Sequence, residues 1–311
     1  MKTLKLHSHG QEVKQLQLLL NLLPDGIFGP QTHKAVLFFQ KSQNIAPDGI
    51  VGPITWSLLY DGWELMHHSL DESTELYTPY FLPYKKTHTK PTQKKWIFLH
   101  HTAGWQNPYR VIDAWNENSE KNIATEFVIG GQSIHNNNSD HDGRILQAIP
   151  NNGWAWHLGI GNHPMHHESI GIELCSFGAL NKGYLEKTVD SKPKYIHKAK
   201  NSFFTYVGQE VNPEQVIELE SEFRGYKYFH KYSDKQLMSL KNLLLKLANE
   251  HNIDVREGLP NLIRKEGVKA FEFIGTKMCD DTHGVWSHAN LNKWKLDVSP
   301  QKRLVEMLLE L

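Results

Sequence analysis

Hydrophobic residues near the start of the chain recur every three or four positions, which is typical of a helix with one apolar face. Four residues show this spacing: Val13, Leu16, Leu20 and Leu23. The sequence Pro-Asp-Gly-Ile-x-Gly-Pro then occurs twice, at residues 24–30 and 47–53, and apolar residues follow each copy. Asp-Gly favours a turn and proline is tolerated in the first turn of a helix, so each copy predicts a turn leading into a helix. This part of the chain therefore predicts three short helices joined by two similar turns.

Beyond residue 95 the pattern changes to short apolar runs that alternate with helical periodicities. The runs predict strands at residues 96–100, 124–129, 144–149 and 169–176. Helices are predicted after Asn107-Pro108, over residues 233–252 and from Ser299-Pro300 onward. Because strands and helices interleave, we expect an α/β domain with a central mixed β-sheet flanked by helices.

The length of the chain, 311 residues, is about twice that of a typical domain and agrees with this division. We expect a small all-α domain of three helices over residues 1–60 and the α/β domain over residues 96–311. Residues 61–95 contain three prolines in a segment without regular periodicity, which predicts a linker.

Charge and composition exclude several classes of protein. The 34 basic and 34 acidic residues give a formal charge of zero, so we expect no nucleic acid as partner. No apolar run approaches the ~20 residues of a membrane span, so we expect no membrane insertion. Residues 1–5 lead into His7 and His9 and not into an apolar segment, so we expect no signal peptide and synthesis in the cytoplasm. We also expect a monomer.

Candidate chemistry is found where the predicted strands end and near the C-terminus. His100 ends the first strand, and Glu173 alternates with isoleucines in the strand at residues 169–176, where a carboxylate is costly unless it is paired or used. His288, Lys295 and Asp297 share one loop. Together with His100 this loop indicates a zinc site, because catalytic zinc takes three protein ligands and a water. The chain has 19 histidines, so packing roles stay open for any of them.

Residues 8–60 resemble the three-helix peptidoglycan-binding domain found on cell-wall hydrolases. The resemblance rests on Gly10, Val13, Leu16-Gln17, Leu20-Asn21, the paired turns, Phe39-Gln40 and Trp56. It implies bacterial peptidoglycan as a partner. The alternative is that the turns only shape a helical bundle.

Residues 95–300 resemble the zinc amidases of the N-acetylmuramoyl-L-alanine amidase type, which include amidase-type phage lysozymes and the peptidoglycan recognition proteins. The matching motifs are residues 98–103, 126–129, 156–159 and 169–173, then His288 with Lys295-x-Asp297. The resemblance implies that His100, His288 and Asp297 bind one catalytic Zn²⁺.

The same resemblance implies roles for other residues. Lys295 matches the lysine that steadies the oxyanion, and Glu173 matches the glutamate used as general base in part of the family. His157 matches a residue that lines the site, and with Glu126 and Trp156 we expect it to bind substrate. Thr125 stands where other members have a catalytic tyrosine, so this chain must depend on Glu173, with Glu126 a weaker candidate.

The implied reaction is hydrolysis of the amide between N-acetylmuramic acid and L-alanine by zinc-activated water. An endolysin that acts on the wall after release by phage-type lysis is the favoured setting, with export by a secretion machine as the alternative. Two other functions stay open: a binding-only peptidoglycan recognition protein, and a zinc peptidase that cuts the stem peptide.

Some features keep a purely structural interpretation. Strand alternation turns His101 away from His100, which favours a supporting role for His101. Trp156 fits a core as well as a sugar-binding surface, and Glu173 fits a buried ion pair. Residues of about 178–232 exceed what a compact family member needs, so they are interpreted as an insertion without an assigned role.

Overall fold

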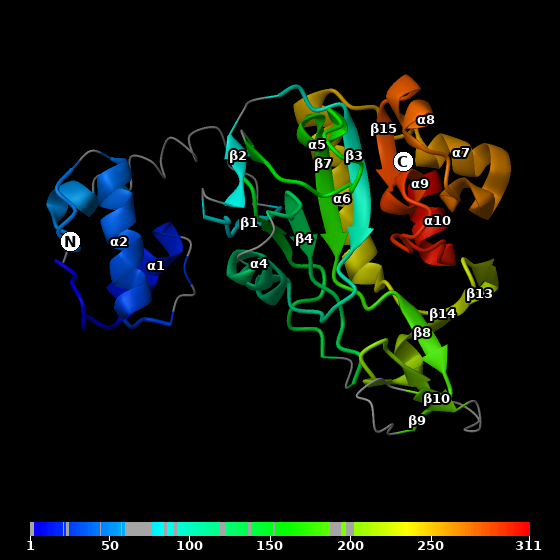
Figure 1. Ribbon diagram of the computed structural model, residues 1–311, viewed down its shortest axis with the longest axis horizontal. Helices are drawn as coiled ribbons and strands as arrows, with labels where there is room; N and C mark the ends of the chain where they lie inside the picture. The colour runs from blue at the N-terminus through cyan, green and yellow to red at the C-terminus, as the bar shows by residue number, and fades with distance from the viewer. Residues whose placement is uncertain are drawn as a thin grey trace. The chain divides into compact units, whose positions relative to one another are not determined.

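The computed structural model divides into two units, Met1–Glu75 and Leu76–Leu311 (Figure 1). The residues that it describes are 3–20, 22, 25–43, 45–56, 58–59, 76–83, 86–89, 92–118, 122–135, 138–151, 153–186, 194–196 and 202–311. Residues 61–75 of the predicted linker lie outside this set, as does Leu23. The later part of that segment lies in the second unit, where it contributes two short strands.

The first unit has the predicted helical fold. Helix α1 spans Gln11–Leu19, helix α2 spans Pro30–Ser42, and residues 53–56 and 58–59 are again helical. Its core consists of buried apolar side chains from all of these helical segments and from the residues before and between them: Leu4, Val13, Leu16, Phe28, Val36, Val51, Trp56 and Leu59. The helical spacing of the sequence therefore marks the faces that pack together.

A glutamine in front of each repeated turn explains why the turn sequence occurs twice. The Gln17 side chain donates to Asp25 Oδ1 at 2.7 Å and accepts from the Gly26 N–H at 2.8 Å. Gln40 makes the same pair of bonds to the second turn, donating to Asp48 Oδ1 at 2.8 Å. Both turns are thus held by a buried amide that satisfies the backbone of the turn.

The second unit is built on a six-stranded sheet with the strand order β1-β5-β4-β7-β3-β15. The strands are β1 Thr78–Pro79, β3 Trp96–His101, β4 Phe127–Ile129, β5 Ile145–Gln147, β7 Ser169–Leu174 and β15 Gly284–Ser287. Strands β15, β3, β7 and β4 run parallel, whereas β4 and β5 are antiparallel. The expected mixed sheet is confirmed.

Helices cover both faces of this sheet, as predicted. Alternate residues of β4 face opposite ways, so Phe127 and Ile129 join the core that contains helix α6, Asp234–His251. Val128 joins the core that contains Ile112 of helix α4, Pro108–Glu117. Figure 1 shows α6 passing behind β3 and β7.

The remaining helices are short and lie mostly toward the C-terminus. They are α5 Met165–Glu168, α7 Leu259–Glu266, α8 Thr276–Asp281, α9 His288–Leu291 and α10 Lys302–Leu309, with 3₁₀ turns at Pro213–Gln215 and Gly267–Phe271. No helix among the described residues is long and apolar enough to cross a membrane.

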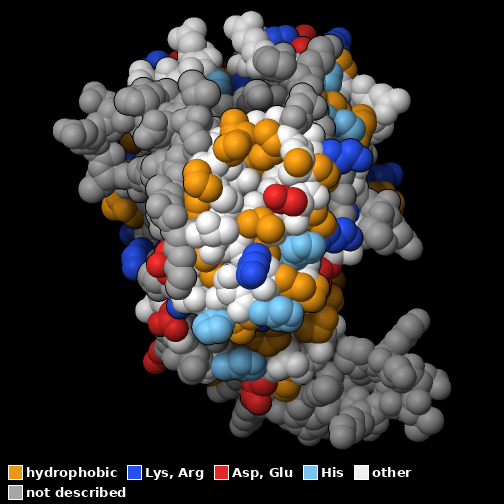
Figure 2. Space-filling view, turned by 90° about the vertical axis from the view of Figure 1, so that its left-hand side faces the viewer, with side chains coloured by type: hydrophobic (Ala, Val, Ile, Leu, Met, Phe, Trp, Pro, Cys, Tyr) orange, Lys and Arg blue, Asp and Glu red, His pale blue; other side chains and the backbone are white. Residues whose placement is uncertain are grey.

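Figure 2 faces the side that lies on the left in Figure 1. Hydrophobic side chains gather on this side, with histidine and basic side chains among them.

The predicted insertion forms a sheet of its own. Its strand order is β12-β11-β8-β14-β13, and every neighbouring pair is antiparallel. The strands are β8 Ala179–Lys182, β11 Phe203–Phe204, β12 Glu210–Val211, β13 Val216–Phe223 and β14 Tyr226–His230. Two further pairs are small: β9 Tyr184–Glu186 with β10 Lys194–Ile196, and β2 His88–Thr89 with β6 Gly153–Trp154.

Candidate metal centre

Three of the predicted site residues meet where the central parallel strands end. His100 is the penultimate residue of β3 and lies opposite Glu173 of β7 in the strand register. His288 begins α9 directly after β15, and Asp297 lies in the loop that follows α9. The side chains of His100, His288 and Asp297 are all buried, because core strands and helices surround these strand ends.

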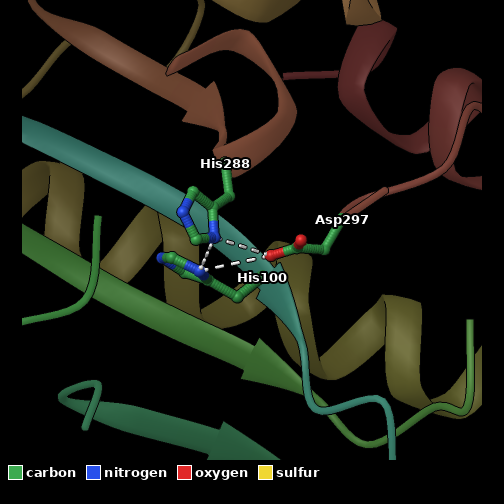
Figure 3. A group of neighbouring side chains, drawn as sticks. All are labelled: His100, His288 and Asp297. Carbon is green, nitrogen blue, oxygen red and sulfur yellow. Dashed lines mark hydrogen bonds and ion pairs between the residues drawn. The ribbon is translucent and has the colours of Figure 1, made fainter. Parts of the chain in front are cut away.

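The ligand atoms of these three residues converge on one point (Figure 3). Nδ1 of His100 lies 2.9 Å from Nδ1 of His288 and 3.3 Å from Oδ2 of Asp297. The distance from His288 Nδ1 to the same oxygen is 3.0 Å. Residues far apart in the sequence thus present two nitrogens and one oxygen to a common centre.

The hydrogen bond on the far side of His288 fixes its tautomer. Nε2 of His288 lies 3.1 Å from the carbonyl oxygen of Leu158. A carbonyl only accepts, so Nε2 carries the proton and Nδ1 turns a lone pair toward the centre.

A longer chain of hydrogen bonds does the same for His100. The Ser169 hydroxyl donates to the Met165 carbonyl, so the Ser169 oxygen must accept from Nε2 of His157, 2.9 Å away. Nδ1 of His157 then accepts from Nε2 of His100 at 3.1 Å. This order leaves Nδ1 of His100 as a second lone pair that faces the centre.

The charge states of these groups fit a divalent cation. Burial, together with the neighbouring His288, lowers the pKa of His100 to about 4, so its ring is neutral near pH 7. Burial alone would raise the pKa of Asp297, but His288 and His100 hold it well below its usual range. Two imidazole lone pairs and a carboxylate at such short distances repel one another unless a cation lies between them. Nitrogen and oxygen ligands of this kind are those that zinc accepts.

Glu173 lies beside this centre, opposite His100 in the strand register. Its Oε2 is buried and has no partner among the described residues. Burial raises the pKa of Glu173 to about 8, the Asp297 carboxylate adds to the rise, and Lys295 opposes it. A carboxyl group that exchanges its proton near neutral pH next to a ligand cluster is typical of a functional site.

Lys295 is exposed on the loop between α9 and Asp297. Its positive charge contributes to lowering the pKa of His100 as well as that of Glu173, so its field reaches the centre. Besides His288, four residues are expected to carry the chemistry. His100 comes from β3, Glu173 from β7, and Lys295 and Asp297 from this loop.

The other expected site residues have different surroundings. Glu126 is buried, its Oε1 lies 3.2 Å from the Lys94 amine, and its Oε2 accepts from the Gly171 N–H at 2.7 Å. Because both oxygens are engaged, this pattern favours a structural ion pair. The half-buried ring of Trp156 packs edge-on against His166 at 4.6 Å between centroids.

Both ring nitrogens of His157 are also engaged, by His100 and Ser169. A side chain at Gly171 would place its Cβ 3.0 Å from His157 Nδ1 and 2.7 Å from Thr125 Cγ2, so glycine leaves the room that His157 occupies. The Thr125 hydroxyl donates to the Phe127 carbonyl at 3.1 Å.

Two residues that contact the site were missed by the sequence reasoning. Ser169 orients His157, and Arg224 of the insertion binds the loop that carries Lys295. Ser169 opens a predicted strand and Arg224 stands in an Arg-Gly turn, but neither pattern indicates a partner elsewhere in the chain.

The fold and the convergent side chains define an α/β protein with a candidate metal centre at its strand ends. The chain belongs to the N-acetylmuramoyl-L-alanine amidase family, whose family model matches residues 90–294. This match contains His100, Glu173 and His288 and ends just before Lys295 and Asp297. A peptidoglycan-binding domain model matches residues 9–59. No curated protein matches the chain.

Several solved structures are similar to parts of this chain. The Burkholderia AP3 phage endolysin is 42% identical over 20% of this chain and 26% of its own, with a TM-score of 0.19. A Clostridioides difficile peptidoglycan-binding protein is 41% identical over 19% of this chain and 40% of its own, with a TM-score of 0.18. The Escherichia coli amidase AmiD is 19% identical over 53% of this chain and 47% of its own, with a TM-score of 0.30. The chain thus spans about a quarter and two fifths of the length of the first two.

Proposed function

We propose that this protein is a peptidoglycan hydrolase that cleaves the amide between N-acetylmuramic acid and L-alanine. One observation carries the proposal. In a chain of the amidase family, two imidazole lone pairs and a carboxylate oxygen converge beside Glu173, whose buried Oε2 has no partner among the described residues.

We propose one zinc ion as the cofactor, held by Nδ1 of His100, Nδ1 of His288 and Oδ2 of Asp297. Zinc in such a site lowers the pKa of a water from ~15.7 toward ~7 and polarises a carbonyl oxygen. The protein fixes the two imidazoles through Leu158 and His157, so their lone pairs are preorganised for the ion.

Glu173 is the general base in this proposal. Its Oε2 takes the proton of the attacking water and then delivers it to the nitrogen of the leaving amine. A pKa of about 8 suits both steps, because near neutral pH the carboxyl group can both accept and release a proton at little cost in free energy. The Lys295 ammonium supplies positive charge toward the oxyanion that forms on the carbonyl.

The expected substrate-binding residues take other roles in this proposal. His157 supports His100, since both of its ring nitrogens are engaged. Glu126 is assigned to its ion pair with Lys94, and Trp156 is kept as a candidate contact for sugar because its ring is half exposed.

The first unit is proposed to hold the enzyme on peptidoglycan. Residues 9–59 match a peptidoglycan-binding model, and linking a binding unit to a catalytic unit raises the effective concentration of substrate. An enzyme of this organisation fits an endolysin that reaches the wall after release from the cell.

Digestion of purified muropeptides, with products identified by mass spectrometry, tests the proposal. We expect a free lactyl carboxylate on the sugar and a free α-amine on alanine, and about 10²–10⁴-fold slower release of both by Glu173→Gln. A shortened stem peptide would instead indicate a peptidase. Binding without any product from the zinc-loaded protein would indicate a recognition protein.

A further inference from the structure

The side chain of Arg224 reaches from the inserted sheet to the loop that carries the candidate active-site residues. Its Nη2 donates to the Ala289 carbonyl at 2.8 Å, and its Nη1 donates to the Asn292 carbonyl at 2.8 Å. Nη1 also donates to the carbonyl of Lys295. One guanidinium therefore gathers three carbonyls from a segment that begins after His288 and ends before Asp297.

These carbonyls are suited to bind a cation. Helix α9 spans only His288–Leu291, so the carbonyls at its C-terminal end lack the intrahelical partners that a longer helix would supply. The C-terminal end of a helix also carries partial negative charge. A planar guanidinium with several fixed donors can serve diverging carbonyls at once, which the single ammonium of a lysine does less well.

The backbone at Arg224 is unusual for an arginine. Strands β13 and β14 are joined by Arg224 and Gly225, which have φ angles of +50° and +84° and lie between the paired residues Phe223 and Tyr226. Such two-residue turns favour asparagine followed by glycine, because positive φ is unfavourable for a larger side chain. An arginine that accepts this strain is expected to contribute through its side chain.

The surroundings of Arg224 hold its side chain toward the loop. The guanidinium carbon lies 5.3 Å from the centre of the Phe223 ring, which is itself buried in the main core. Nε lies 3.9 Å from a carboxylate oxygen of Glu272. The arginine is thus directed from the hairpin tip onto the loop.

The part of the loop that Arg224 binds has few other anchors. Trp294 is 81% exposed, and Lys293 and Lys295 are also exposed. The other hydrogen bonds of residues 292–296 are local. Lys295 N donates to Asn292 O, Trp294 N donates to Asn292 Oδ1, and Asn292 N donates to the His288 carbonyl of α9. Among the described residues, the hydrogen bonds that tie 292–296 to parts of the protein outside residues 288–297 come from Arg224.

We propose that Arg224 is a positioning residue for the active site and that the insertion serves as its support. By gathering the carbonyls of 289–295, it fixes where the Lys295 ammonium and the Asp297 carboxylate lie relative to His100. The catalytic part of this inference rests on the proposed function.

Arg224→Asn is the sharpest variant, because asparagine suits the turn and removes the guanidinium. We expect kcat to fall by about 10–100-fold with little change in KM, and zinc affinity to weaken by about the same factor, as for other groups that support metal ligands. Zinc affinity is measured by competition with a chelator. The melting temperature of the metal-free protein should not fall, because the turn itself is relieved. Arg224→Lys should recover only part of both losses.

Hydrogen exchange of the loop amides tests the contact without any assay of activity. We expect faster exchange over residues 289–297 in metal-free Arg224→Asn and unchanged exchange in Lys227→Ala. Lys227 is the matched control, since it lies in the same hairpin and forms a surface pair with Glu218 at 3.6 Å. Unchanged loop exchange and zinc affinity in Arg224→Asn would overturn the proposal. If the wild type binds zinc but cleaves no amide, the proposed function fails, and the exchange experiment still decides the role of Arg224.

Discussion

Replacing Glu173 by glutamine should stabilise the metal-free protein and strongly lower the turnover of the zinc-loaded protein. The glutamine side chain has nearly the shape of a protonated glutamic acid and carries no charge. Glu173 is half-buried, and burial with the nearby Asp297 carboxylate disfavours its ionised form. The negative charge of ionised Glu173 therefore destabilises the folded wild-type protein, and a neutral glutamine does not.

The size of the effect follows from the difference in pKa between the two states. The pKa of Glu173 is about 8 in the folded protein, against 4.5 for an unperturbed glutamate. Between these values the folded state holds a proton that the unfolded state has released, so stability falls as the pH rises through this window. Each pH unit corresponds to about 1.4 kcal/mol. Since solvent screens a half-buried group, we expect Glu173→Gln to gain about 1–3 kcal/mol at pH 7.

Urea unfolding of the two metal-free proteins between pH 5 and pH 8 measures this difference. The gain of Glu173→Gln should grow with pH and level off near pH 8, whereas turnover of the zinc-loaded variant should drop by about 10²–10⁴-fold. Glu126→Gln is the matched control. It leaves the buried Lys94 without its carboxylate partner, so it should destabilise the protein by about 3–5 kcal/mol.

Two results would refute this reasoning. A gain in stability that does not depend on pH would show that the carboxyl ionises normally in the folded protein. Normal turnover by Glu173→Gln would show that another group takes the proton, and the role of general base would have to be reassigned.

Three further outcomes are expected. Asp297→Ala should lower bound zinc, measured by elemental analysis, together with activity, whereas Lys295→Ala should keep the metal and lose about 10²–10³-fold in turnover; full zinc in Asp297→Ala would remove it from the ligand set. Burial lowers the pKa of His230 to about 3, so the unfolded state takes up a proton first as the pH falls below 6.5; this group alone should lower stability by about 1.4 kcal/mol per pH unit there, so the stability of His230→Asn relative to the wild type should rise by that amount as the pH falls. Removing residues 1–75 should spare cleavage of soluble muropeptides and weaken lysis of whole sacculi; an equal loss on both substrates would contradict the anchoring role.

Local patterns in the sequence predicted much of the fold. Helix α6 was predicted at residues 233–252 and spans Asp234–His251, because regularly spaced leucines and an N-terminal Ser233 act on the same segment. Ser233 and Gln236 have the spacing of a capping box, but only half of this motif forms. Ser233 accepts from the Gln236 N–H, but the Gln236 side chain donates to the carbonyls of Ile129 and Cys175 instead. A local motif thus gave way to tertiary contacts.

Other elements carried weaker signals. Strands β1 and β2 have two residues each and lie among prolines, so periodicity could not reveal them. Strand β13 is different: Glu218, Glu220 and Glu222 alternate with Leu219, Ser221 and Phe223, which is typical of a strand, although no strand was predicted there. Its sequence was informative, but the pairing that makes it the edge of a five-stranded sheet is not a local property.

The site shows the same limit more sharply. The family motifs named His100, His288 and Asp297, yet the 2.9 Å approach of two Nδ1 atoms depends on which strands lie side by side and in which register. The order of hydrogen bonds from Met165 to His100 depends in addition on a helix end and a strand start that meet in space. Such relations are set by tertiary packing and leave no mark at a fixed spacing in the sequence.

The candidate metal centre is therefore supported from two parts of the fold. One is the main six-stranded sheet and the other is the inserted sheet. His100 is held from behind, through His157 and Ser169 in the sheet layer. The loop with Lys295 and Asp297 is held from the inserted sheet, through Arg224. A loop with mostly exposed side chains cannot fix a ligand within a fraction of an ångström by itself, since burial supplies little of its stability. In the role that we propose for it, the insertion adds hydrogen bonds through Arg224 where exposed side chains contribute little burial. This gives a physical reason for its place next to the loop that carries Lys295 and Asp297.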